Sequence, residues 1–201
     1  YGTEKRDLEN RYISYVNSLI KNGKNSAIIE DLSDYKSQLL NIKKDNDETV
    51  NTIYEQLHSL YDELHNSKQF KELDKEFWNI VDSLPESLKA KIKKNAAYYN
   101  SQKLSYLERD KRFVSIFERI LSFKGYDSVK DKIQNLLDIV NERLTINDVF
   151  ININELNRAK SELIDKYHDT VLSYYERLAK KHNLISLDEF AQWNISEQQN
   201  R

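Results

Sequence analysis

The sequence predicts an all-α protein, an elongated antiparallel helical bundle with about four long helices and a partly polar interior. Apolar residues recur every three or four positions over most of the 201 residues, as they do along one face of an amphipathic helix. Helix breakers are scarce, because the chain has three Gly and one Pro. With 39% hydrophobic and 32% charged residues, the core must be narrow and the exterior heavily solvated. We expect a single helical-bundle domain over residues 1–201.

The longest uninterrupted helical pattern runs from Ser26 to Asn66. At about 1.5 Å per residue it would form a rod roughly 60 Å long, along which other helices must pack. The pattern weakens over residues 43–49, where the polar Asn46 and Thr49 lie. This weakening indicates either a stutter in one helix or a true break with a new cap, and we favour one helix. The apolar face consists of Ile28, Leu32, Tyr35, Leu39, Ile42, Val50, Ile53, Leu57, Leu60 and Leu64.

Shorter helices are expected on either side of this stretch. The spacing of Leu8, Tyr12 and their neighbours predicts a helix over residues 4–21, ended by a left-handed cap at Gly23. After the long stretch, Ser67 begins a shorter helix that must end before Pro85, because Pro cannot continue a helix.

The residues after Pro85 predict one long helix that Gly125 ends. Ser83 and Glu86 match a capping box, with Pro in the first turn. Lys103 and Asp110 lie in the otherwise apolar line of this helix, and an unsatisfied buried polar group costs about 1–3 kcal/mol. Either the helix turns them outward, or Lys103 pairs with Asp110 or with a carboxylate across the interface.

The four residues Asn46, Thr49, Lys103 and Asp110 together form the expected polar seam of the bundle. One interpretation is that they only fix the register of the helices. The functional interpretation is that a poorly sealed interior keeps the bundle marginally stable. The bundle could then open and present its apolar faces to a membrane or to a partner protein.

The last part of the chain predicts two more long helices and a short one. Asp127 or Ser128 caps a helix that ends near residue 144. Residues 146–151 alternate like a strand, but a single short strand has nothing to pair with, so we expect a linker packed over the bundle. Asn152 caps the last long helix, and Ser186 with Glu189 caps a short terminal helix.

Composition argues against several kinds of chemistry. A formal net charge of -2 gives no attraction to nucleic acid, and the isolated Gly residues cannot form a phosphate-binding loop. Without Cys there is no disulfide framework or thiol nucleophile. No run of residues is apolar enough to span a bilayer. We therefore expect a non-enzymatic chain that binds neither nucleotide nor nucleic acid. Because the sequence begins at Tyr1 without Met, we expect that a leader has been removed and that the protein is secreted. The triplet Asn194-Ile195-Ser196 matches the N-glycosylation pattern, which recurs by chance.

One spacing resembles a metal site. A carboxylate three residues before a histidine, repeated on facing helices of a bundle, can hold two metal ions. The 33 acidic residues of the chain will produce such pairs by chance, so we interpret them as solvated helix faces and expect no metal, no cofactor and no catalytic residue. The pairs are Glu55 with His58, Asp62 with His65 and Asp165 with His168.

A resemblance to a known family rests on the size of the chain, its helical pattern without Cys, its bias to Asn, Lys and Tyr, and the polar residues Asn46, Lys103 and Asp110. In these features the chain resembles the apicomplexan sporozoite microneme proteins essential for cell traversal. The resemblance implies a four-helix bundle with a hydrophilic interior, release from a secretory organelle, and a part in breaching host cells at a host membrane or a host-cell surface protein. The alternative is a helical surface adhesin of an AT-rich bacterium, which would bind a host protein.

Overall fold

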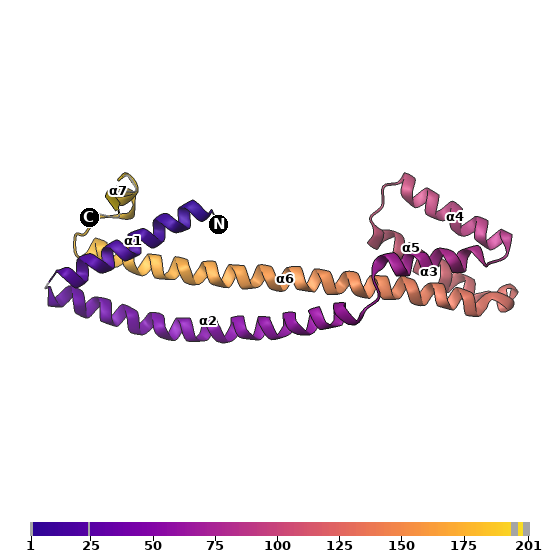
Figure 1. Ribbon diagram of the computed structural model, residues 1–201, viewed down its shortest axis with the longest axis horizontal. Coiled ribbons are helices and arrows are strands. Elements are labelled where there is room, and N and C mark those ends of the chain that lie inside the picture. The colour runs from indigo at the N-terminus through magenta and orange to yellow at the C-terminus, as the bar shows by residue number, and fades with distance from the viewer. Residues whose placement is uncertain (1, 24, 194–196, 199–201) are drawn as a thin grey trace. The chain divides into compact units, whose positions relative to one another are not determined.

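The structure is a computed structural model that describes residues 2–23, 25–193 and 197–198. These residues are almost entirely helical and include no strand, which confirms the all-α prediction. The long helices are α2 and α6, where the sequence pattern indicated about four. In chain order (Figure 1) the elements are α1 (Thr3–Asn22), α2 (Ser26–Asn66), α3 (Phe70–Asp82), α4 (Glu86–Ser101), α5 (Tyr106–Ser122), the 3-10 helix η1 (Lys124–Val129), α6 (Lys130–Lys181) and α7 (Leu187–Ala191).

Helix α2 passes through residues 43–49 without a break, as the sequence favoured. Local bonds along the helix support this segment: Lys43 forms an ion pair with Asp47 at 2.8 Å, and the Thr49 hydroxyl donates to the Asp45 carbonyl at 3.1 Å. Asn46 is half-buried and Thr49 is exposed. The expectation that Thr49 lies in the interior is therefore wrong, because the helix turns it toward solvent, whereas Asn46 is partly covered.

Residues 102–105 interrupt the long helix expected after Pro85. Lys103 adopts a φ of 54°, the left-handed conformation that ends many helices, and its N–H donates to the Asn100 carbonyl at 3.0 Å. Ser105 then caps α5 by accepting from the Glu108 N–H at 3.3 Å. Lys103 is exposed in this turn, so its expected place in the seam is wrong. The apolar spacing continues across the turn because α4 and α5 face the same core.

Helix α6 runs unbroken through residues 146–151, so the expected linker and the cap at Asn152 are wrong. Ile146, Val149 and Ile153 are buried, and their separations of three and four residues are those of a helix face. The exposed Phe150 lies among them and gives the segment its strand-like appearance.

Among the other helix ends, those at Gly23 and Ser83 differ from expectation and the one at Ser186 is confirmed. Gly23 has a φ of -82°, so it is extended and not left-handed. Ser83 does not cap α4; its hydroxyl donates back to the Ile80 carbonyl at 2.6 Å. Ser186 does cap α7, since its hydroxyl accepts from the Glu189 N–H at 3.2 Å.

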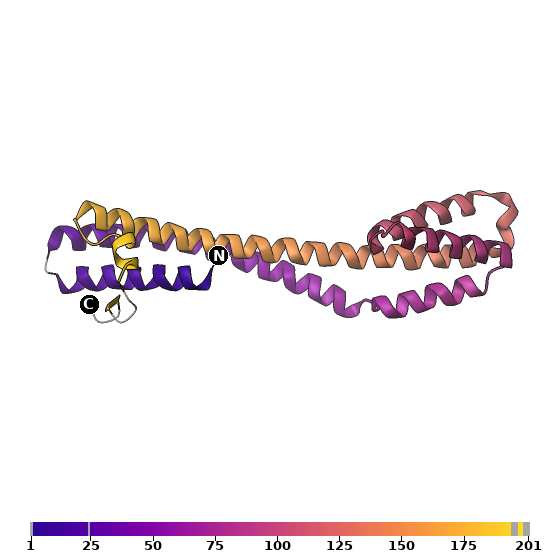
Figure 2. The ribbon, with the colours of Figure 1, turned by 90° about the horizontal axis from the view of Figure 1, so that it is seen from above.

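Contacts divide the chain into two compact units, residues 1–55 with 157–201 (unit 1) and residues 56–156 (unit 2). In unit 1, α2 runs antiparallel to α6, because Asp31 contacts His182 and Tyr35 contacts Tyr174. Helix α1 lies beside them, with α7 close to it (Figure 2). The unit 1 core consists of Tyr12, Val16, Ile20, Leu32, Tyr175, Leu178, Ala179 and Phe190.

Unit 2 is built from α3, α4, α5, η1 and the adjoining parts of α2 and α6. Aromatic rings occupy the centre of its core. The ring centroids of Phe77 and Phe113 lie 5.3 Å apart. Phe113 also stacks on Phe117, with 5.7 Å between their ring centroids. The single domain expected over residues 1–201 stays a prediction.

Candidate functional site

Asp110 is the only residue of the expected polar seam that is buried, with 2% of its surface exposed. Its Oδ1 accepts from Nη2 of Arg143 at 2.7 Å, and Arg143 itself is 1% exposed. The guanidinium also lies 4.9 Å from the centre of the Phe77 ring, and its Nη1 lies 3.4 Å from Oδ1 of the half-exposed Asp74. The partner of Asp110 is therefore an arginine on α6, and not Lys103.

The environment of Asp110 disfavours its charge. Burial raises the pKa of this carboxyl to about 6, although Arg143 and then Arg109 act in the opposite direction. Desolvation thus exceeds the attraction of the arginines. A rise of that size above 3.8 corresponds to about 3 kcal/mol against the ionised form. The folded state binds this proton at a higher pH than the unfolded state does. Protonation of Asp110 therefore adds to the stability of unit 2 as the pH falls through 6, and this contribution is lost as the pH rises through 6.

Sequence reasoning missed Arg143, although a signal was present. The buried line that begins at Val129, the last residue of η1, continues along α6 through Ile133, Leu136 and Val140, in alternating steps of four and three. The next step of three falls on Arg143, whereas the apolar Leu144 beside it is the residue that sequence reasoning selects. A charged residue that continues an apolar line predicts a buried partner of opposite charge.

A groove of about 580 Å³ lies between the end of α1 and the first turns of α2 in unit 1. Two of its apolar side chains are largely open to solvent, since Ile29 is 46% and Leu40 is 68% exposed. None of the described side chains that line the groove is acidic. The lining residues are Ile20, Lys21, Ile29, Leu32, Ser33, Lys36, Ser37 and Leu40.

The groove was not anticipated because it lies off the predicted apolar stripe of α2. Leu32 belongs to both, but Ile29 and Leu40 sit one position beside stripe residues and read as isolated surface positions. Only the placement of α1 next to this face of α2 makes a groove of them.

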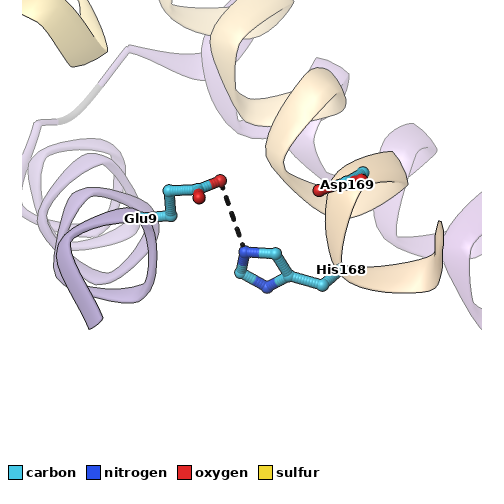
Figure 3. A group of neighbouring side chains, drawn as sticks. All are labelled: Glu9, His168 and Asp169. Atoms are coloured by element: carbon cyan, nitrogen blue, oxygen red, sulfur yellow. Dashed lines mark ion pairs between the residues drawn. The ribbon is translucent and has the colours of Figure 1, made fainter. Parts of the chain in front are cut away.

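A third feature is a polar group where α1 meets α6 in unit 1 (Figure 3). Glu9, His168 and Asp169 each offer a ligand atom that lies within 4.8 Å of the others. Nε2 of His168 is 3.5 Å from Oε2 of Glu9, and both side chains are largely buried. Asp165, the carboxylate paired with His168 by sequence spacing, instead forms an ion pair with Arg6.

The other carboxylate and histidine pairs form no such group among the described residues. His58 and His65 are both exposed on α2, and His58 lies 3.4 Å from the exposed Asp62. Glu9 was missed in the sequence because it is charged, although it precedes the buried Tyr12 by one helical step of three.

Compared with known proteins, the chain matches no family model, no curated protein and no solved structure. Fold and surface define an all-α protein with an apolar groove bordered by lysines. Among the described residues, no helix combines the length and apolar character needed to cross a bilayer. The Asn194-Ile195-Ser196 triplet lies outside the described residues.

Proposed function

We propose that this chain is a non-enzymatic binding protein that holds an acidic amphipathic helix of a partner protein in the groove between α1 and α2. The observation that carries this proposal is the exposed apolar surface of Ile29 and Leu40, which lines a groove together with Lys21 and Lys36. Exposed apolar residues gathered in one groove with a polar border are typical of a binding surface.

The dimensions of the groove suit a helix. Ile29 and Leu40 are three helical turns apart on α2, which is about 16 Å along its axis. An amphipathic helix docks into such a groove through apolar side chains that repeat every three or four residues. Three turns of a partner helix would cover both exposed residues.

The charges of the groove select the partner. Lys21 and Lys36 both line it, and none of the described lining side chains would repel an anion. Complementary charge at the border of an interface mainly increases specificity and association rate. We therefore expect a partner helix with Asp or Glu flanking its apolar face. A host-cell surface protein is a partner that both sequence-based hypotheses allow.

Two labelled peptides of about 18 residues test this proposal, since shorter isolated helices are marginal in water. Both carry the same Leu face, with Glu on the flanks of one and Lys on the flanks of the other. Fluorescence anisotropy should show saturable binding of the Glu peptide only. Leu40→Ser should weaken binding about tenfold or more, because a buried Leu contributes about 1.5–3 kcal/mol.

Charge-reversed variants supply the matched control. Lys36→Glu should weaken binding of the Glu peptide, while Lys111→Glu, an exposed lysine on α5, should leave it unchanged. Equal affinity for both peptides, or no effect of either groove variant, would show that the groove is not the binding site.

A second candidate function is supported by the buried ion pair of unit 2. The pair costs stability at neutral pH, so the unit could open and expose Phe113, Phe117 and Ile120, which are buried in its core, to a host membrane. This is the mode of action that the resemblance to the cell-traversal proteins implies. The formal net charge of -2 gives no attraction to anionic lipid, so binding would depend on opening.

Dye release from neutral and anionic liposomes tests this second function. If opening of unit 2 causes leakage, the double variant Asp110→Leu/Arg143→Met, which removes the buried charges, should leak less than the wild type. Leakage should also be weaker at pH 5 than at pH 7, because protonation of Asp110 stabilises the unit. Leakage that increases on acidification or is unaffected by the double variant would contradict this mechanism.

A further inference from the structure

Residues 87–107 of unit 2 carry charge of one sign only. This segment, which includes all of α4 except Glu86, contains five lysines and no acidic residue, although the chain has 33 acidic residues in 201. The formal net charge of -2 is therefore an average over unlike parts of the chain. Because electrostatic attraction extends only about 8 Å at physiological ionic strength, a partner that approaches α4 meets the local positive charge.

One flank of α4 presents part of this charge to solvent. The side of α4 that faces the unit 2 core consists of Leu88, Ile92, Ala96 and Tyr99. Away from this side, Lys91, Lys94 and Tyr98 follow one another in steps of three and four, which places them on one helix face. All three are exposed, Tyr98 by 54%, and α4 lies at the outer edge of unit 2 (Figure 1). We call these three residues the basic face of α4.

The other flank of α4 shows what its lysines can bind. Asp82, the last residue of α3, has its Oδ1 3.1 Å from Nζ of Lys93 and 3.9 Å from Nζ of Lys89. One carboxylate thus lies beside two lysines that are one helical turn apart. Among the described residues, neither Lys91 nor Lys94 forms an ion pair. The basic face therefore offers two similarly spaced cations without the carboxylate.

We propose that the basic face of α4 binds an acidic segment of a partner protein. Carboxylates of the partner lie beside Lys91 and Lys94 as Asp82 lies beside the lysines of the other flank, and an apolar side chain packs on the ring of Tyr98. Tyr is enriched among the residues that dominate interface energies, and complementary charge adds specificity and association rate. This surface belongs to unit 2 and does not depend on the groove of unit 1.

Two other anionic occupants fit this face less well. Stable attraction to anionic lipid takes clusters of about four to eight basic residues, whereas the basic face has two lysines. Nucleic-acid recognition favours the planar fork of Arg, and all four cations of α4 are lysines. A carboxylate is also the group that lysines of this helix already contact.

Two labelled peptides test the proposal on the full chain. One has Glu at every third or fourth position and a single Phe, and the other is identical except that Gln replaces each Glu. Neither has the row of Leu that would fill the groove. Fluorescence anisotropy should show saturable binding of the Glu peptide only, and added NaCl should weaken this binding because salt screens the charges.

Variants of exposed side chains locate the binding surface. Lys91→Glu/Lys94→Glu should lower the affinity for the Glu peptide about tenfold or more, and Tyr98→Ser should lower it about fivefold. The matched control is Lys71→Glu/Lys75→Glu, which reverses two exposed charges one helical turn apart on α3. This control should bind the peptide as the wild type does.

The groove variant Lys36→Glu separates this surface from the proposed function, because it should leave binding of the present peptide unchanged. Vesicles of anionic lipid and a single-stranded oligonucleotide serve as competing probes. The proposal is overturned if the wild type does not bind the Glu peptide, if binding survives Lys91→Glu/Lys94→Glu, or if Lys71→Glu/Lys75→Glu weakens it equally. Tighter binding of either competing probe through Lys91 and Lys94 would overturn it too.

Discussion

Replacing Asp110 by Asn should remove a specific part of the pH dependence of stability in unit 2. The carboxyl has a pKa of about 6 in the folded state against an ordinary 3.8. Proton linkage then gives the folded state about 1.3 kcal/mol more stability from this group at pH 5 than at pH 7. The Asn variant keeps the side-chain shape and an acceptor for Arg143, but it cannot titrate, so this gain should be absent.

Urea unfolding followed by the fluorescence of Trp78 measures this effect in the relevant unit. Trp78 packs against Phe77 in unit 2, while the other tryptophan, Trp193, belongs to unit 1. In a Trp193→Phe background the signal therefore reports on unit 2 alone. Other titrating groups contribute equally to both proteins and cancel in the comparison.

Asp131→Asn is the control, because Asp131 is an exposed carboxylate on α6 and should leave the pH dependence unchanged. An equal change in unfolding free energy between pH 5 and pH 7 for the wild type and Asp110→Asn would refute this assignment. An excess of the opposite sign in the wild type would also refute it. Removing both charges in Asp110→Leu/Arg143→Met should be neutral or stabilising by about 1–4 kcal/mol, whereas Arg143→Met alone should cost about 3–5 kcal/mol.

Three backbone features give further predictions. Ile151→Pro should cost about 3 kcal/mol or more and reduce helical circular dichroism, because Ile151 lies inside α6; a linker would tolerate Pro. Lys103→Gly should raise the free energy of unfolding by about 1 kcal/mol, and the urea midpoint with it, because a φ of 54° strains Lys but not Gly. A lower midpoint would argue against this turn. Ser186→Ala removes the cap of α7 and should cost about 1 kcal/mol, with increased acrylamide quenching of Trp193; unchanged quenching and stability would show that the cap contributes nothing.

Features governed by local rules could be predicted from the sequence. The continuous helix α2 follows from the spacing of its apolar residues and the lack of Gly and Pro, and the cap of α7 follows from Ser186 and Glu189. In each case the interacting residues are close in the chain. The spacing also identified Leu32, Leu39, Ile53 and Leu57 as apolar core residues, and all four are buried.

Features that depend on tertiary contacts could not be predicted in this way. The turn at Lys103 was hidden because both flanking helices face one core, so the apolar pattern does not change where the chain reverses. Asp110 and Arg143 are 33 residues apart, and nothing local connects them. The contact between Glu9 and His168 links α1 to the second half of α6. Spacing within one helix instead predicted Asp165 as the partner of His168.

The discontinuous composition of unit 1 affects how the chain can fold during synthesis. Unit 2, residues 56–156, is a continuous segment, whereas unit 1 needs residues from both ends of the chain. At about 5–20 residues per second, synthesis of roughly 100 intervening residues takes about 5–20 s. During that time α1 lacks the surfaces of α6 and α7 that cover Tyr12, Val16 and Ile20 in the core. Unit 2 can therefore fold first. Until α6 and α7 have been synthesised, the charged residues around the apolar face of α1 keep this helix soluble.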